Sequence, residues 1–264
     1  MNSIEPAYDV SDHWVSCSKP NSEALARLFV FPYAGAGSTT YLAWSRLFSP
    51  EIEVYLVHLP GRDKRIKEAP FVQLAPLVES LSSVLGRYLD KPISLFGHSM
   101  GGLVSFEVAR QLRRDYAIVP IHLFVSARLA PHLPDSRQKL YQIPDKEFLS
   151  AVEERYGALP QVVIEDQELL KLFLSILRAD LTLLETYQYV DETPLECPIS
   201  VCGGLQYQTI SHDELVAWRD QTVARFDLKM FPGDHFFIQG SKLAVAHTIN
   251  EELAKFINNC RGSS

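Results

Sequence analysis

Residues 97–102, which read Gly-His-Ser-Met-Gly-Gly, constrain this chain more than any other segment. They follow a short apolar run at 92–96 and precede apolar residues at helical spacing, which predicts a sharp turn between a buried strand and a helix. Such a turn strains Ser99, exposes its hydroxyl and places it beside the first N–H groups of the helix. An ordinary glycine-rich turn is the alternative, but the flanking strand and helix favour a serine nucleophile.

A serine nucleophile needs a base, and His235 is the histidine best placed to serve as one. It follows a short alternating strand and a Pro-Gly break, and an amphipathic helix comes after it. This agrees with the chain order serine, acid, histidine that accompanies turns of this type. The other histidines after Ser99 lie where packed or solvated side chains are expected: His122, His132, His212 and His247.

Strands and helices alternate along most of the chain. Buried strands are expected at 28–32, 54–59, 121–126, 199–202 and 228–231, and a helix at about 73–89. This alternation predicts an α/β fold in which a mostly parallel sheet carries helices on both faces. Because α/β domains of this length commonly form one unit, residues 1–264 are expected to be a single domain.

Residues from about 134 to 192 break the alternation. They carry helical patterns at 146–156 and 166–187 instead of strands, and the apolar stripe of the second is too wide for one packing face. We interpret this stretch as a helical lid over the site, whose excess apolar surface would suit an acyl chain. A helix wedged between two others is the alternative.

Composition and terminal sequence exclude several classes of function. The net charge of −7 argues against nucleic acid as a partner. No apolar run approaches the length of a membrane span, and the first residues lack the basic and apolar regions of a secretory signal. The four cysteines have no metal-binding spacing and are expected to be reduced thiols, which indicates a cytoplasmic protein.

Two backbone N–H groups are needed to bind the oxyanion that forms when a serine attacks a carbonyl. Met100, the residue after the nucleophile, is expected to supply one of them. The second should come from the glycine-rich loop at 31–38, where Ala34 is the first choice and Tyr33 the second. The loop has neither a G-x-G-x-x-G pattern nor a P-loop lysine, so a phosphate-binding role is not favoured.

With these landmarks, the chain resembles the type II thioesterases of polyketide and nonribosomal peptide synthesis. This group also includes the animal medium-chain acyl-carrier-protein thioesterase. The resemblance covers about residues 25–258. All α/β-hydrolases share the serine turn, but Leu-Pro-Gly-Arg at 59–62 and Leu-Arg-Ala-Asp at 177–180 narrow the match. Further landmarks lie at 31–35, 218–220 and 231–236.

The resemblance implies an α/β-hydrolase fold and an activity. It implies hydrolysis of acyl thioesters held on the phosphopantetheine arm of an acyl or peptidyl carrier protein, in a pathway such as antibiotic biosynthesis. Ser99 would attack the thioester carbonyl, His235 would take its proton, and Met100 and Ala34 would bind the oxyanion. No metal or cofactor is implied, and we expect a monomer.

The third member of the catalytic triad is where this sequence departs from the family pattern. The family aspartate, in the pattern Gly-Gly-x-x-Asp, falls on Tyr207, and a related group's acid position falls on Ser126. Asp213 is the nearest candidate acid, although it lies in a capping-box sequence, and Asp234 directly adjoins the base. Two functions therefore stay open: an active editing thioesterase, or a carrier-binding protein of this fold with weak or no turnover. An esterase for small oxygen esters is a lesser alternative.

Two charged segments have more than one interpretation. The basic residues between 62 and 67 could meet an acidic carrier protein, or they could simply be solvated. Arg178 and Asp180 could form an ion pair between the lid and the core.

Overall fold

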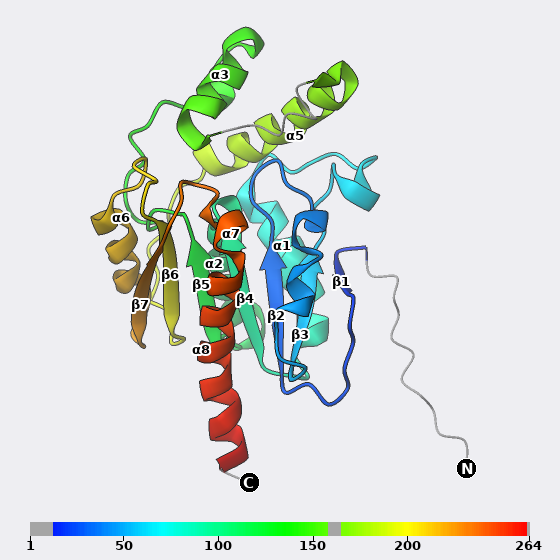
Figure 1. The fold of residues 1–264 in the computed structure, drawn as a ribbon, viewed down its shortest axis with the longest axis vertical. Coiled ribbons are helices and arrows are strands. Elements are labelled where there is room, and N and C mark those ends of the chain that lie inside the picture. The colour runs from blue at the N-terminus through cyan, green and yellow to red at the C-terminus, as the bar shows by residue number, and fades with distance from the viewer. Residues whose placement is uncertain (1–12, 158–164, 263–264) are drawn as a thin grey trace, which may run out of the picture.

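The computed structural model describes residues 13–157 and 165–262. Figure 1 shows one sheet with helices on both faces. Seven strands follow the order β1-β3-β2-β4-β5-β6-β7, and every neighbouring pair is parallel except β1 with β3. The strands are β1 Val15–Cys17, β2 Ala26–Phe31, β3 Ile52–Val57, β4 Ile93–His98, β5 His122–Ser126, β6 Ile199–Gly204 and β7 Phe226–Phe231. The expected α/β-hydrolase type of sheet is confirmed.

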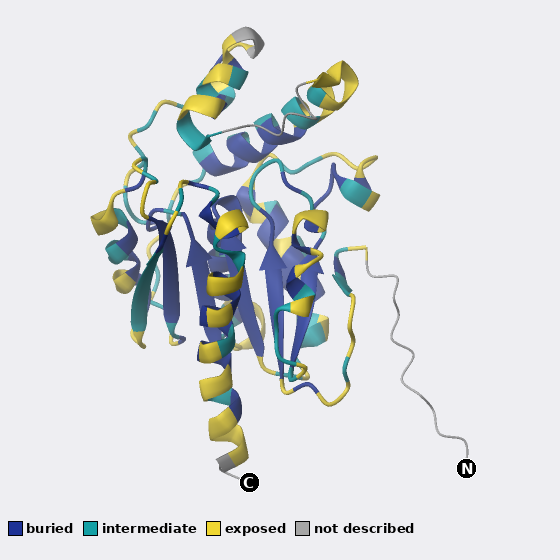
Figure 2. Ribbon diagram, in the orientation of Figure 1, coloured by how far each residue is buried: buried dark blue, intermediate teal, exposed yellow. Residues whose placement is uncertain are grey.

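Helices cover the two faces of the sheet and one of its ends. They are α1 Leu74–Leu85, α2 Met100–Tyr116, α3 Asp145–Tyr156, α5 Gln167–Glu185, α6 His212–Val216, α7 Phe237–Gly240 and α8 Lys242–Gly262. One apolar core lies between the sheet and α1 and α2, and a second lies under α8. Strands β2, β3, β4 and β6 are therefore buried along their whole length, as Figure 2 shows. Continuous apolar runs of this kind are typical of parallel strands covered on both faces.

Helices α3 and α5 lie above the carboxyl ends of the strands (Figure 1). The described part of the stretch from 134 to 192 contains helices and no strand, as expected. The second half of α5 packs into the core, whereas Leu169 and Leu172 in its first half are 46% and 41% exposed. The apolar stripe of α5 is therefore buried in the second half of the helix and partly exposed in the first half.

The edge strand of the sheet was not expected from the sequence. Strand β1 has only three residues and pairs antiparallel with β3 at the edge of the sheet. A run of three residues is too short to show an alternating pattern.

Among the described residues, no helix is long and apolar enough to cross a bilayer.

Candidate active site

The turn around Ser99 has the predicted strained geometry. Ser99 joins β4 to α2 with φ 53° and ψ −111°, a left-handed conformation that is uncommon for a residue other than glycine. Its N–H donates to the carbonyl of Ser126 at the end of β5, at 2.7 Å. The flanking glycines are required by close packing, because a Cβ on Gly97 would lie 2.0 Å from the Gly101 carbonyl oxygen. A Cβ on Gly101 would likewise lie 2.3 Å from the carbonyl oxygen of Phe31.

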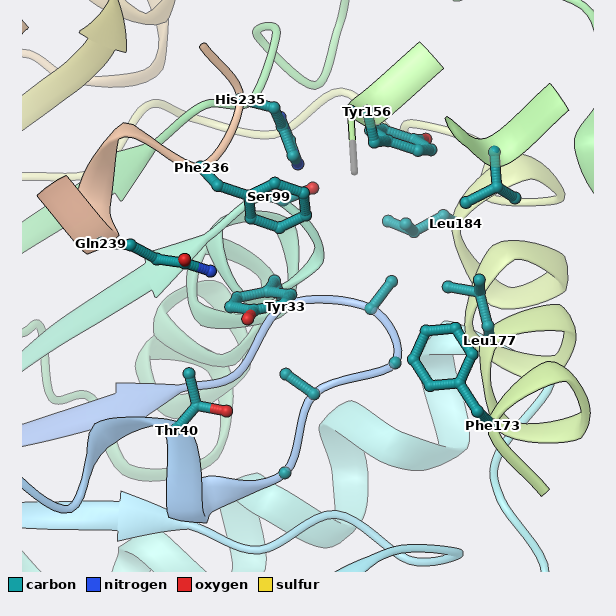
Figure 3. A pocket seen from close by; sticks show the side chains of 16 residues that line it. Tyr33, Thr40, Ser99, Tyr156, Phe173, Leu177, Leu184, His235, Phe236 and Gln239 are labelled. Carbon is teal, nitrogen blue, oxygen red and sulfur yellow. The ribbon is translucent and has the colours of Figure 1, made fainter. Parts of the chain in front are cut away.

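Ser99 and His235 line the same cavity, which has a volume of about 240 Å³. Figure 3 shows the His235 imidazole directed at the Ser99 hydroxyl, with the side chains of α5 on the opposite wall. His235 comes from the loop between β7 and α7, and Ser99 from the turn between β4 and α2. The fold thus brings together two residues that are far apart in the chain, at the carboxyl edge of the sheet where ligands of open α/β folds bind.

Of the two expected oxyanion donors, Ala34 lines this cavity, and Met100 directly follows Ser99, which also lines it. Met100 is the first residue of α2, so its N–H has no acceptor within the helix. Ala34 lines the cavity in the loop after β2. The next two N–H groups of that loop are already used, because Gly35 donates to Asp180 Oδ2 at 2.8 Å and Ala36 donates to the Tyr33 carbonyl at 3.0 Å.

Aromatic side chains enclose His235, which is only 3% exposed. The ring centroids of Tyr207, Tyr156 and His98 lie 4.7, 5.0 and 5.1 Å from the imidazole centroid. Burial is the main reason that the pKa of His235 falls to about 3, and the guanidinium groups of Arg137 and Arg128 lower it further. The imidazole is therefore neutral at physiological pH but holds a proton weakly.

Among the residues that the structure describes, no carboxylate is hydrogen-bonded to His235 Nδ1 as a triad acid would be. Within the described residues, Nδ1 of His235 is buried and has no hydrogen-bond partner. Asp213 is not brought to the site, which corrects its candidacy as the acid: its side chain is fully exposed beside His212 in the first turn of α6. Asp234 is exposed and accepts from the Phe236 N–H at 2.8 Å. The Tyr207 ring, tilted by 52° to the imidazole, packs against the base instead.

A second serine–histidine pair lies outside the cavity. His122 Nε2 and Ser200 Oγ are 2.8 Å apart, and the His122 ring stacks on Phe124. Both residues stand near the amino ends of β5 and β6, the opposite edge of the sheet from Ser99. This pair is packed inside the sheet, where it has no access to the cavity that Ser99 lines.

A buried ion pair ties α5 to the loop that carries Ala34. Arg62 Nη1 and Nη2 donate to the two carboxylate oxygens of Asp180, each at 2.7 Å, and both side chains are at most 5% exposed. Asp180 also accepts the Gly35 N–H, and Arg62 also donates to the Ala36 carbonyl at 3.2 Å. The pair therefore holds the backbone on both sides of Gly35 and fixes the direction of the neighbouring Ala34 N–H.

These contacts show which charged residues of the two segments are buried and which partners they have. Arg62 and Arg65 are 5% and 6% exposed, so half of the basic patch between 62 and 67 is buried and unable to meet a partner. Asp180 pairs with the core through Arg62, whereas Arg178 donates to the carbonyls of Tyr141 and Ile143 at 2.8 and 2.9 Å.

The sequence analysis did not select two residues that lie near His235. Arg128 follows β5 by two residues, and Tyr156 ends α3. The position of Arg128 was a usable signal, because residues just after parallel strands gather at the edge where Ser99 and His235 lie. Tyr156 reaches the base only through the tertiary placement of α3, which the sequence pattern does not give.

Removing the charge of Asp180 should destabilise the protein and weaken catalysis. In Asp180→Asn, the Arg62 guanidinium stays buried without a counter-charge, and loss of one partner of a buried pair costs about 3–5 kcal/mol. Glu168→Gln on the same helix is the matched control, since its pair with Lys171 is exposed and worth at most about 1 kcal/mol. Urea unfolding gives both values, and equal losses in the two variants would contradict a structural role for the buried pair.

Comparison with known proteins finds a matching family model and two similar proteins of known names. A family model described as "Thioesterase domain" matches residues 26–253. The chain is 39% identical to the gramicidin S biosynthesis protein GrsT of Aneurinibacillus migulanus over 240 residues, which cover 91% of this chain and 93% of GrsT. It is 32% identical to the medium-chain S-acyl fatty acid synthase thioesterase of Rattus norvegicus, over 85% of this chain and 86% of the rat protein.

A solved structure agrees with these relatives. The type II thioesterase BorB from the borrelidin biosynthetic cluster superposes with a TM-score of 0.82 at 30% identity. The superposition covers 92% of this chain and 97% of BorB.

Proposed function

This chain belongs to the thioesterase family, and on that premise we propose that it hydrolyses acyl thioesters carried on the phosphopantetheine arm of an acyl or peptidyl carrier protein. The observation that carries the proposal is the shared cavity of Ser99, His235 and Ala34. A nucleophile, a base and an oxyanion donor in one concave site form the set that acyl transfer requires.

The residues of the cavity act in two successive steps of the proposed reaction. The Ser99 oxygen attacks the thioester carbon while His235 takes the hydroxyl proton, and the N–H groups of Met100 and Ala34 stabilise the oxyanion. The carbon–sulfur bond then breaks, and His235 returns the proton to the leaving thiolate. Water, deprotonated by His235, next attacks the acyl-serine ester. The bond between the acyl carbon and the Ser99 oxygen then breaks, and His235 gives its proton to that oxygen, which releases the carboxylic acid and restores Ser99.

The cavity walls support an acyl group as the part of the substrate that enters. Val152 from α3 and Phe173, Leu177 and Leu184 from α5 make the far wall apolar. Gly35, also at the cavity, has Phe173 within 3.0 Å of where its Cβ would lie, so α5 closes tightly over the oxyanion loop. We therefore propose that α3 and α5 act as a lid, and that the helix covering the acyl chain also holds the donor loop.

The environment of His235 favours a second candidate function. Among the described residues Nδ1 has no acceptor, so turnover would be low, and the chain would then act mainly by binding acyl carrier proteins. Such a protein would share the fold and the cavity of an active thioesterase and differ from it in the rate of thioester hydrolysis.

A panel of acyl-carrier proteins with chains from acetyl to long-chain, beside a nitrophenyl ester, tests the proposal. We expect thioester hydrolysis to exceed ester hydrolysis and to decline for long chains, because Phe173 and Leu177 limit a cavity of about 240 Å³. Phe173→Ala should move the preference toward longer chains, whereas Leu243→Ala on the exposed surface of α8 should leave it unchanged. A preference for the nitrophenyl ester would favour a small-ester esterase, and tight carrier binding without turnover would favour the second candidate.

A further inference from the structure

Asp63 contacts the segment that follows the oxyanion donor Ala34. It has φ 49°, a left-handed conformation that is uncommon for a residue other than glycine. Its Oδ2 accepts from the Ser38 hydroxyl at 3.0 Å, and its Oδ1 accepts from the Thr39 hydroxyl at 3.2 Å. Residues in such conformations persist only where the surrounding structure holds them, and they are frequent at functional sites.

The Asp63 carboxylate also lies against Gly37, which lines the cavity of Ser99. A Cβ on Gly37 would lie 2.2 and 2.4 Å from the two carboxylate oxygens. Gly37 has φ −95°, which any residue can adopt, so the close approach of Asp63 and not the backbone conformation requires glycine there. The hydrogen bonds from Ser38 and Thr39 keep the carboxylate in this place.

A chain of hydrogen bonds runs from the Asp63 carboxylate to the edge of the sheet. Ser38 Oγ is 2.8 Å from His58 Nδ1, and His58 Nε2 is 2.7 Å from Ser16 Oγ in β1. Because a carboxylate only accepts, Ser38 gives its one hydroxyl proton to Asp63, and His58 Nδ1 donates to Ser38. The charge of Asp63 therefore sets the direction of these bonds and strengthens them.

Two neighbouring residues of one turn thus hold the segment after Ala34 at two points. Arg62 donates to the Ala36 carbonyl at 3.2 Å and pairs with Asp180. Asp180 in turn accepts the N–H of residue 35. Asp63 holds the residues that come next, which the Arg62 pair does not reach.

We propose that Asp63 is a positioning residue, which keeps the Ala34 N–H directed at the oxyanion by fixing Ser38 and Thr39. Glycine has more backbone freedom than any other residue, and with glycines at 35 and 37 the donor could turn away if the segment were held at one point only. A donor lowers the barrier only when it points at the place where charge develops, so a small rotation weakens transition-state stabilisation more than substrate binding. This inference rests on the proposed function, because it assigns a role in the same reaction.

Asp63→Gly tests the role, because glycine adopts the same φ and removes both acceptors. We expect kcat for the preferred acyl-carrier protein to fall about tenfold, a part of the roughly 10²–10³-fold that loss of a whole oxyanion donor costs, while KM changes less than about twofold. Lys64→Gly is the matched control, since it brings the same flexibility into the same turn at an exposed residue and should leave kcat unchanged. Equal kcat values in the two variants would overturn the proposal.

Gly37→Ala tests the same contact from the other side. Its methyl group would displace the Asp63 carboxylate, so kcat should fall to a similar degree. In the double variant with Asp63→Gly, the methyl group meets no carboxylate, and we expect no loss beyond that of Asp63→Gly alone. Losses that multiply in the double variant would overturn the proposed link between Asp63 and this segment.

Two measurements without a carrier protein separate this inference from the proposed function. Amide hydrogen exchange at residues 37–40 should be faster in Asp63→Gly than in Lys64→Gly. An alkyl boronic acid, which forms a tetrahedral adduct with a serine nucleophile, should bind about tenfold more weakly to Asp63→Gly. Both effects in a chain that hydrolyses no acyl-carrier protein would uphold the role of Asp63 and remove the proposed function. Hydrolysis that requires Ser99, with kcat and boronate affinity unchanged in Asp63→Gly, would uphold the function and remove the positioning role.

Discussion

Ser99→Ala is expected to abolish thioester hydrolysis while leaving the fold intact. Removal of the serine nucleophile from a complete triad lowers kcat by about 10⁶-fold, whereas removal of its acid alone costs about 10⁴-fold. Because no described carboxylate is bonded to His235, we expect the further loss in this chain to be about 10²-fold. The alanine fits the same left-handed turn, and Gly97 and Gly101, which packing requires there, are unchanged. Steady-state hydrolysis of the preferred acyl-carrier protein measures the loss, and circular dichroism checks the fold.

Ser200→Ala is the matched control for this variant. Ser200 also lies at hydrogen-bond distance from a histidine, His122, but at the opposite edge of the sheet and away from the cavity. We expect kcat to stay within about twofold of the parent, with a stability loss of about 1 kcal/mol from one buried hydrogen bond. Residual turnover of more than a few per cent in Ser99→Ala, with contamination excluded, would contradict the nucleophile assignment.

The parts of the site that local sequence could predict are those built from short patterns. The turn at Ser99, the loop with Ala34 and the loop with His235 each follow a recognisable strand, and the parallel sheet brings such positions to one edge. The separation of these residues along the chain did not affect the prediction, because the direction of each strand determines at which edge of the sheet its carboxyl end lies. The same reasoning could have drawn attention to Arg128, which follows β5 in the same way.

The parts that the sequence could not give depend on long-range contacts between side chains. Asp180 was a candidate for a pair between lid and core, but its partner Arg62 is 118 residues away and was grouped with a surface patch. Likewise, the position of Tyr207 was identified, yet the enclosure of His235 by Tyr156 and Tyr207 follows from how two loops and α3 meet. Nearness to the family position selected Asp213, but Ser211 and Glu214 form the capping box of α6, and Asp213 lies exposed in the first turn of that helix.

Tyr207→Asp is expected to raise kcat/KM, by as much as the roughly 10⁴-fold that separates a triad with its acid from one without. The loop is already held near the base by the hydrogen bond from the Gln206 N–H to the Gly233 carbonyl, and Nδ1 of His235 has no hydrogen-bond partner among the described residues. A carboxylate at position 207 would therefore meet the Nδ1 donor, and the positive charges of Arg128 and Arg137 act on that position. Asp213→Asn is the matched control, since its exposed carboxylate should be dispensable.

The pH dependence gives a readout that a purely structural effect would not change. His235 is faced by His98 from β4, by Tyr156 from α3, by Tyr207, and by Arg128 and Arg137 from the loop after β5. Burial and these cations hold its pKa at about 3, so the base stays neutral down to low pH. A nearby carboxylate favours the imidazolium and raises that pKa, so protonation removes the base at a higher pH. In Tyr207→Asp, the acidic limb of the kcat/KM profile should thus move upward in pH while the plateau rises.

A severe loss of kcat/KM in Asp213→Asn, with no gain of kcat/KM in Tyr207→Asp, would show instead that Asp213 serves as the acid in solution.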